Sequence, residues 1–286
     1  MVSTIRKQTL LLAAACSAAA ALAAAGFILD NRRVDAGEVT VRISTLPAGL
    51  DGLRIAHLSD LHYPKCARSP QALAELVESL EPDLIVLTGD LIDRHETFDR
   101  KELAEAAERL AAIAPSYAVA GNHEFRAGAF DEWKTILTEN GVTVLDDEWA
   151  VFTRDGAALL LGGLTHGKPD ALLERDGCRV VLSHYPENFP DYAGAGYDLV
   201  LSGHAHGGQV RIFGHGLLSP GEGLFPRYTS GLYRKENTQM VVSRGLRSGW
   251  MPPRVGNAPH LPLVVLEADP EGMTGTGNAG HPEREK

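Results

Sequence analysis

Short apolar runs follow one another along most of the chain and predict β-strands. The runs cover residues 39–44, 53–59, 84–88, 117–120, 142–145, 158–162, 179–183, 199–202, 240–243 and 263–266. Between the early runs, apolar residues recur at helical spacing and predict helices over about 70–80, 100–113 and 129–139. Ser69-Pro70 is a start signal for the first helix, and Asp99 with Glu102 forms a capping box for the second. After about residue 203, the pattern predicts strands and turns.

The order of these elements predicts the fold class. Strands alternate with helices in the first half, as in β-α-β crossover units, and the second half is rich in strands. This order favours an α/β architecture with mixed sheets. Residues 34–268 are expected to form one domain, and the tail 269–286, made largely of Gly, Pro and charged residues, is expected to be disordered.

Residues 9–29 contain no charged side chain and are rich in alanine. A helix of 21 residues is just long enough to cross the hydrocarbon core of a bilayer, so residues 1–33 are expected to act as a membrane anchor. Alanine is only weakly apolar, and the small residues at 23–25 suit a signal peptidase, so a cleaved secretory signal is the main alternative. A helix of a soluble protein is the third possibility for this segment.

Basic residues flank this segment equally on both sides, with Arg6 and Lys7 before it and Arg32 and Arg33 after it. The charges therefore do not decide the orientation. By default a short N-terminus stays in the cytoplasm, which places the following domain on the outer side of the cytoplasmic membrane. The cytoplasmic face stays open as the alternative.

Composition excludes two other classes of protein. The chain of 286 residues has 27 Lys+Arg and 37 Asp+Glu, a net charge of −10, so nucleic-acid binding is not expected. Three cysteines without a CxxC pair support neither a disulfide framework nor a thiolate zinc cluster. Cys66 follows the first candidate ligands closely but is expected to be an inert thiol.

Side chains that bind metal ions follow five of the predicted strands directly. They occur in Asp60-Leu61-His62, Gly89-Asp90-Leu91-Ile92-Asp93, Gly121-Asn122-His123-Glu124, Ser183-His184 and Gly203-His204-Ala205-His206. The carboxyl ends of strands in open α/β sheets are where binding sites form. Oxygen and imidazole ligands without thiolates suit Mn, Fe or Zn. The sequence therefore predicts a metal site built from these strand ends.

In this order the five segments resemble the D-x-H, GDxxD, GNHE, H and GHxH motifs of the calcineurin-like metallophosphoesterases. The stretches 183–187 and 203–209, with Tyr228-Thr229-Ser230-Gly231 and Ser243-Arg244-Gly245, are similar to the membrane-associated bacterial phosphodiesterase branch. The resemblance covers about residues 39–267. It implies a four-layer α/β/β/α sandwich of two mixed β-sheets that holds two divalent metal ions.

The resemblance also implies which ligands bind which ion. One ion is expected on Asp60, His62 and His206, the other on Asn122, His184 and His204, with Asp90 bridging the two. Among these side chains only a carboxylate readily spans two cations, and two bridged cations can activate a water and stabilise charge that develops at phosphorus.

Two further residues are implied to act in catalysis. His123 would protonate or stabilise the leaving oxygen, and Asp93 would fix the tautomer of His123 through a hydrogen bond. The alternative for Asp93 is a helix N-cap. Arg94 is expected to be surface charge rather than a phosphate ligand, because His95 replaces the glycine that follows the matching arginine in the protein-phosphatase branch.

Three more histidines are ambiguous in sequence. His57 alternates with Leu58 along its strand and is expected to be a satisfied interior residue. His166, at the end of a strand, is either a substrate contact or, as we expect, a solvated loop residue. His260 stands in Pro259-His260, where the branch often has Pro-Glu, so no substrate contact is inferred there.

The expected activity is hydrolysis of a phosphodiester or pyrophosphate bond in a phosphate-ester substrate. A lipid-linked substrate suits a membrane tether, and the branch includes enzymes that resemble UDP-2,3-diacylglucosamine pyrophosphatases of lipid A synthesis. That substrate is cytoplasmic, which conflicts with the outward orientation. The alternatives are a phosphomonoesterase and a catalytically silent metal-binding scaffold. The sequence does not decide the oligomeric state.

Overall fold

The computed structural model describes residues 33–172, 175–219, 223–248 and 254–269, together with Ser17 and Asn31. Apart from Ser17, the predicted membrane segment at residues 9–29 lies outside the described residues, as does all of the predicted tail beyond Asp269. Of the helices in the described ranges, none has the length and apolar character that crossing a bilayer requires.

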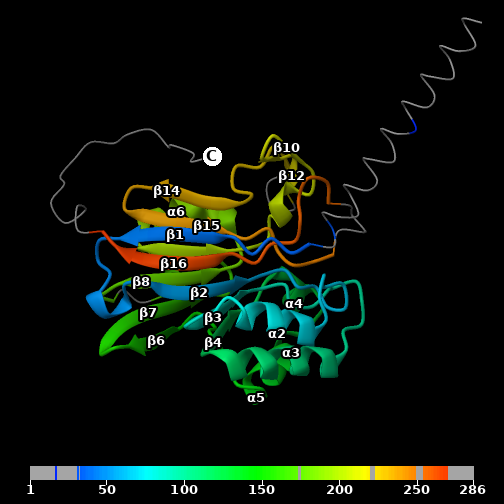
Figure 1. Ribbon diagram of the computed structural model, residues 1–286, viewed down its shortest axis with the longest axis horizontal. Helices are drawn as coiled ribbons and strands as arrows, with labels where there is room; N and C mark the ends of the chain where they lie inside the picture. Colours follow the sequence, from blue (N-terminus) through cyan, green and yellow to red (C-terminus); the bar gives the residue numbers. More distant parts are fainter. Residues whose placement is uncertain are drawn as a thin grey trace, which may run out of the picture.

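Two six-stranded mixed sheets form the body of the molecule (Figure 1). The first has the order β1 (Glu38–Ile43), β16 (Leu263–Ala268), β2 (Leu53–Leu58), β3 (Leu84–Thr88), β4 (Ser116–Val119) and β5 (Val142–Val144). The second has the order β14 (Gly231–Lys235), β15 (Thr238–Val242), β9 (Leu199–Ser202), β8 (Arg179–Ser183), β7 (Ala157–Leu164) and β6 (Trp149–Arg154). In each sheet four consecutive strands run parallel, namely β2 to β5 and β15 to β7.

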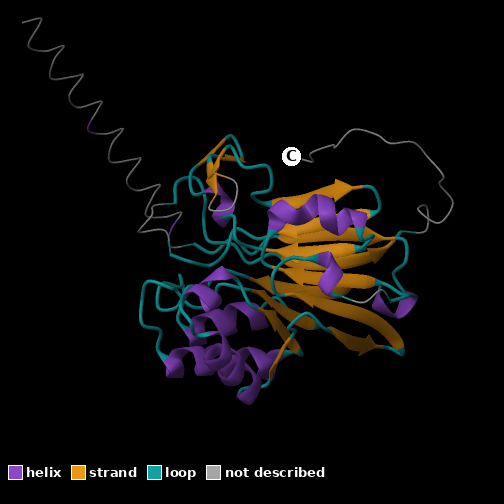
Figure 2. Ribbon diagram, turned by 180° about the vertical axis from the view of Figure 1, so that it is seen from behind, coloured by secondary structure: helices purple, strands orange, loops and turns teal. Residues whose placement is uncertain are grey.

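Alternate residues of the strands pack in different layers. In β2, Leu53 and Ile55 lie in the apolar core between the sheets, whereas Ala56 and Leu58 pack against helices on the outer face. These helices are α2 (Pro70–Glu78), α3 (Arg100–Ile113) and α5 (Phe130–Glu139). The short helix α6 (Phe189–Gly194) covers the outer face of the second sheet (Figure 2). The predicted four-layer α/β/β/α sandwich is confirmed.

Every predicted strand and helix is present, with ends shifted by a few residues. Of the strands in the two large sheets, β6 and β14 escaped prediction. Both are edge strands whose side chains are mostly exposed or half-buried. β14 ends in the charged pair Arg234-Lys235 and has only a short apolar stretch, whereas β6 begins with the apolar run Trp149–Phe152, which the prediction passed over. The short helices α4 (Asn122–Arg126) and α6 were also missed, because five or six residues are too few to show helical periodicity.

Two small hairpins extend from one end of the sandwich (Figure 1). Strands β10 (Arg211–Ile212) and β11 (His215–Gly216) form the first, and β12 (Leu218–Ser219) and β13 (Gly223–Leu224) form the second. They follow the His204-Ala205-His206 segment directly, which confirms the predicted change to strands and turns after residue 203.

Candidate dinuclear metal centre

The candidate ligands occupy the carboxyl ends of strands from both sheets. Asp60 and His62 follow β2, Asp90 follows β3, Asn122 follows β4, His184 follows β8, and His204 and His206 follow β9. All seven side chains are buried. Two sheets packed face to face thus bring seven residues that span 147 positions of sequence to one end of the sandwich.

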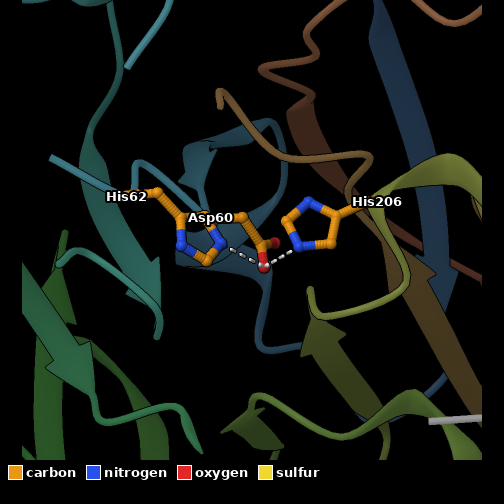
Figure 3. Close-up of side chains that lie close together, drawn as sticks. All are labelled: Asp60, His62 and His206. Carbon is orange, nitrogen blue, oxygen red and sulfur yellow. Dashed lines mark ion pairs between the residues drawn. The ribbon is translucent and has the colours of Figure 1, made fainter. Parts of the chain in front are cut away.

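One group consists of Asp60, His62 and His206, each with a ligand atom within 4.8 Å of the others. The Nε2 atoms of His62 and His206 lie 3.9 and 3.7 Å from Asp60 Oδ1 (Figure 3). The two imidazole rings therefore converge on one carboxylate oxygen. This is the donor set that the resemblance to the calcineurin-like metallophosphoesterases implies for one ion.

The second group consists of Asp90, His184 and His204. His184 Nε2 lies 3.2 Å from Asp90 Oδ2, and His204 Nδ1 lies 3.1 Å from His184 Nε2. The same Asp90 Oδ2 is also 3.7 Å from His62 Nε2 of the first group. Asp90 thus lies between the two groups, which is the position that a bridging ligand requires.

Several donor atoms at this centre are buried without a hydrogen-bond partner among the described residues. They are both ring nitrogens of His62, Nδ1 of His206 and Oδ1 of Asn122. Leaving such an atom unsatisfied costs about 1–3 kcal/mol. A divalent cation beside the Asp60 carboxylate would satisfy His62 Nε2, and a second cation would satisfy Asn122 Oδ1. The residues present therefore fit two divalent ions.

Electrostatics prepares most of the histidines for metal binding. Burial lowers the pKa of His62 and His204 to about 3 and that of His206 well below its usual value, so these rings are neutral and keep a free lone pair. Burial also opposes charge on His184, but the Asp90 carboxylate more than offsets this and raises the pKa of His184 to about 10.

Hydrogen bonding orients His184 toward the centre. Its Nδ1 lies 2.7 Å from the Thr88 carbonyl oxygen, which can only accept, so Nδ1 carries a hydrogen and Nε2 points at Asp90. A backbone partner that fixes the far nitrogen is the usual support of a metal-ligating imidazole.

The backbone at the ligands is strained. Positive φ angles between 46° and 65° occur at Asp60, His62, Asp90, His204 and His206. Non-glycine residues rarely adopt this conformation, and it persists at functional sites where surrounding contacts enforce it. Two glycines are required because other atoms lie very close to their backbone. A Cβ at Gly203 would collide with Ser59 Oγ, and a Cβ at Gly121 would collide with Asp90 Oδ1.

Glu124 holds the Asp90 loop in place, a role that was not predicted. The side chain is fully buried, and its carboxylate accepts hydrogen bonds from the backbone N–H groups of Asp90 (3.1 Å), Leu91 (2.7 Å), Ile92 (3.3 Å) and Gly121 (2.9 Å). Two ligand-bearing loops are thereby tied together. Its place beside Asn122 and His123 was the available signal, but residue types do not reveal contacts to backbone atoms.

His123 is oriented differently from the prediction. Its Nδ1 accepts a hydrogen bond of 3.0 Å from the backbone N–H of Arg94, whereas Asp93 Oδ1 is 4.0 Å away, so the predicted hydrogen bond to Asp93 is not formed. Since Nδ1 accepts, the hydrogen of the neutral ring is on Nε2, which lies 3.8 Å from Asp90 Oδ2. Burial lowers the pKa of His123 and favours this neutral form.

Asp93 serves the adjacent loop. Its carboxylate accepts from the backbone N–H of His95 (2.9 Å) and from Lys65 Nζ (3.1 Å), and no helix begins there, so the N-cap alternative is wrong as well. One oxygen of Asp93 is 4.0 Å from His62 Nδ1. The Arg94 side chain is exposed and donates to His95, as expected of surface charge.

A cavity of about 470 Å³ opens beside the second ligand group. Its lining combines Asn122 and His204 with residues outside the motifs, namely Phe125, Arg126, His166, Tyr185 and Glu187. The His166 ring lies 4.8 Å from that of Phe125 and also lines a neighbouring cavity of about 630 Å³. His166 is exposed, as expected, but its position favours the alternative of a substrate contact.

The remaining ambiguous residues are structural. His57 is fully buried between the sheets with Nε2 2.8 Å from Thr88 Oγ1, which confirms the interior position, but its Nδ1 has no hydrogen-bond partner among the described residues, so the ring is only half satisfied. Burial raises the pKa of Cys66 to about 11, in agreement with an inert thiol. Asn257, which was not predicted, donates to the carbonyl oxygens of His206 (2.8 Å) and Gln209 (3.1 Å) and so fixes the last ligand loop.

The fold and this centre define a class, an α/β sandwich whose strand ends gather carboxylates, an amide and imidazoles that can bind divalent metal ions. The calcineurin-like phosphoesterase family matches residues 53–208, more than half of the chain. The chain belongs to this family and is a metal-dependent phosphoester hydrolase.

Relatives with assigned names agree with this class. The uncharacterized metallophosphoesterase YkuE of Bacillus subtilis is 28% identical over 253 residues, covering 84% of this chain and 88% of that protein. Phosphodiesterase YaeI of Escherichia coli is 30% identical over 211 residues, covering 68% of this chain and 75% of that protein. A transmembrane protein with metallophosphoesterase domain from Danio rerio is 30% identical over 262 residues, covering 80% of this chain and 56% of that protein.

Proposed function

We propose that the chain hydrolyses a phosphodiester bond with two divalent ions of Mn, Fe or Zn. The observation that carries the proposal is the position of Asp90 Oδ2, 3.2 Å from His184 Nε2 and 3.7 Å from His62 Nε2, between two groups of ligands. Asp60, His62 and His206 would hold one ion, and Asn122, His184 and His204 the other. When bound, two such ions supply an activated water and neutralise charge at phosphorus.

His123 and Asp93 take different parts in this proposal. His123 presents Nε2–H to the centre, so it donates a hydrogen bond to the leaving oxygen and stabilises the charge that forms there. Arg94 holds the ring through its backbone. Asp93 supports the loop that carries Arg94 and therefore positions His123 indirectly.

The cavity favours a diester over a monoester. A phosphodiester carries a second organic arm, and the space of about 470 Å³ beside Asn122 and His204 can receive it. Phe125 and Tyr185 offer apolar surface there, and Arg126 offers a cation. The phosphodiesterase name of the relative YaeI supports the same choice.

We further propose that residues 1–33 attach the chain to the cytoplasmic membrane and that the catalytic domain lies on its outer side. The uncharged stretch 9–29 and the transmembrane relatives support attachment. The pyrophosphatase substrate of lipid A synthesis finds no support in the relatives' names or in the site. The proposal therefore stops at the phosphodiester bond of a substrate that a membrane protein can reach.

Elemental analysis and turnover of chromogenic esters test this function. The chain reconstituted with Mn, Zn or Fe should hold close to two ions and hydrolyse bis(p-nitrophenyl) phosphate faster than p-nitrophenyl phosphate. Occupancy below one ion, or full turnover in excess EDTA, would contradict the two-ion centre. Faster turnover of the monoester would favour the phosphomonoesterase, and two bound ions without turnover the silent scaffold.

A further inference from the structure

Large exposed apolar side chains gather in one place. The described residues contain seven, and six of them lie on or beside the two small hairpins. These six, the apolar patch, are Ile212, Phe213, Leu218, Leu224, Phe225 and Val255. Phe213, Phe225 and Leu224 are 95%, 78% and 73% exposed. Soluble proteins rarely expose so many large apolar side chains in one patch unless the patch binds a protein, a ligand or a membrane.

Backbone hydrogen bonds join the patch into one unit. The N–H of Arg211 donates to the Val255 carbonyl (2.9 Å), that of Leu217 to Val210 (3.0 Å), and that of Phe225 to Leu217 (2.9 Å). The two hairpins and the segment around Val255 are therefore held beside each other, at the end of the sandwich where they extend in Figure 1. The patch is a built surface and not a set of independent loops.

The patch lies next to the place where the N-terminal segment joins the domain. Asn31, only two residues after the uncharged stretch 9–29, is buried, and its Nδ2 donates a hydrogen bond of 3.1 Å to the carbonyl of Arg254. Arg254 directly precedes Val255. A membrane that holds the N-terminal segment is thus brought to the immediate neighbourhood of the patch.

We propose that the apolar patch contacts the surface of the lipid bilayer in which the N-terminal segment is anchored. The inference rests on the proposed membrane attachment. Phenylalanine and leucine at the tips of turns enter the boundary between headgroups and acyl chains. Arg227, exposed two residues after Phe225, supplies a cation of the kind that anionic headgroups attract.

This contact also orients the metal centre. Only five residues separate the ligand His206 from Ile212 of the patch, and Asn257 ties His206 to Gln209 at one end of this stretch. The centre therefore lies close to the membrane surface, within reach of phosphodiesters in the headgroup region. The substrate class that follows is a lipid phosphodiester, hydrolysed without leaving the bilayer.

The full chain in vesicles of phosphatidylcholine and phosphatidylglycerol tests the contact. An environment-sensitive dye is attached to Phe213→Cys and, as a matched control, to Val151→Cys, an exposed apolar position (52%) on β6. Cys16, which lies in the N-terminal segment, is replaced by Ala in every variant. Burial raises the pKa of the native Cys66 and Cys178 thiols to about 11 and 12, so they label slowly at neutral pH. The chain with only the Cys16→Ala change gives the background.

Brominated lipids should quench the dye at position 213 and not the dye at 151. A chain that stays with the vesicles while the dye at 213 is unquenched overturns the contact. Energy transfer between dyes on two copies, without lipid quenching, also overturns it and assigns the patch to a second copy. A chain that washes off the vesicles overturns the attachment and with it this inference, whereas hydrolysis of bis(p-nitrophenyl) phosphate reports separately on the proposed activity.

A paired variant tests the consequence for substrate. Phe213→Glu with Phe225→Glu should lower turnover of phosphatidylglycerol in vesicles by about tenfold or more, since losing 1.4 kcal/mol of surface binding is a tenfold change. Turnover of bis(p-nitrophenyl) phosphate should be unchanged, which shows that the fold is intact. The Val151→Glu variant should behave like the unsubstituted chain. Equal loss on both substrates, or no loss on either, contradicts the proposal.

Discussion

The candidate metal centre and the β10–β13 hairpins are neighbours, yet they depart from the usual distribution of side chains in opposite ways. The centre buries carboxylates and imidazoles that would be more stable in water. The hairpins expose phenylalanine and leucine that would be more stable in a core. Both arrangements cost stability, and both therefore mark surfaces and sites that are kept for function.

The two regions differ in where the compensating partner lies. At the centre, part of the compensation is inside the chain, since Glu124 accepts four backbone N–H groups and Asn257 holds the last ligand loop. For the patch, the described residues offer turns and hairpin hydrogen bonds but no apolar cover. Substitutions at the centre should therefore change chemistry first, whereas those on the hairpins should change what the molecule contacts.

The largest effect is expected at Asp90. Asp90→Asn removes the charge that faces both ligand groups. It should lower activity by at least about 10⁴-fold, more than the loss of a single general acid, because both ions would be affected. Elemental analysis should show reduced metal content as well. Asp99→Asn, the same chemical change at the exposed cap of α3, should leave both unchanged. Full metal content and turnover in Asp90→Asn would refute the bridging role.

His123→Ala should keep both ions and lower turnover by about 10²- to 10⁴-fold for substrates with an alkoxide leaving group. The loss should be small for p-nitrophenolate, because that group leaves without help. A leaving-group series measures this difference. Asp93→Asn should show a weaker dependence, since its carboxylate is 4.0 Å from the ring and acts through the loop. Equal losses along the series would mean that His123 acts on something other than the leaving oxygen.

Glu124→Gln should weaken metal affinity or activity by about 10- to 100-fold, as for other residues that orient ligands without touching the metal. The amide keeps one acceptor oxygen where the carboxylate offers two, so backbone N–H groups of the Asp90 loop lose partners. Metal titration followed by turnover measures the change. Glu139→Gln, at an exposed position on α5, is the control. Unchanged affinity and turnover would show that the loop holds its shape without the carboxylate.

Sequence was most informative where chemistry and position coincide. Apolar runs with β-branched residues located the central strands, and the ligand types that follow them predicted which strand ends meet. Partners that act through backbone atoms were hidden: Arg94 orients His123 by its N–H, and Glu124 accepts N–H groups regardless of the side chains that carry them. The patch also escaped prediction, because Phe213 and Phe225 in a sequence look like any core residue until folding leaves them outside.

His57 is a buried histidine that is not among the candidate metal ligands, so its burial should affect stability and not activity. Burial lowers the pKa of His57 from 6.5 to about 3. Between these two pH values the unfolded chain is therefore protonated at His57 and the folded chain is not. Stability should therefore fall as pH drops from about 6 toward 3, with a limiting slope of about 1.4 kcal/mol per pH unit from this group. His57→Gln should flatten the slope while activity at pH 7 is kept. The buried His260 also contributes to the pH dependence of stability, but it does so equally in the unsubstituted chain and in the variant. The quantity to measure is therefore the difference between the two slopes of unfolding free energy against pH.

The smallest effect on stability is expected on the patch. Phe213→Ala should change the free energy of unfolding by less than about 0.5 kcal/mol, because the ring is 95% exposed and removing it leaves no cavity. Phe189→Ala is the matched control: this ring is buried against the second sheet, and its loss should cost about 3–5 kcal/mol. Denaturant unfolding of both variants in one detergent compares them. A cost above about 1 kcal/mol for Phe213→Ala would mean that the hairpins stabilise the fold, and the contrast between the two regions would disappear.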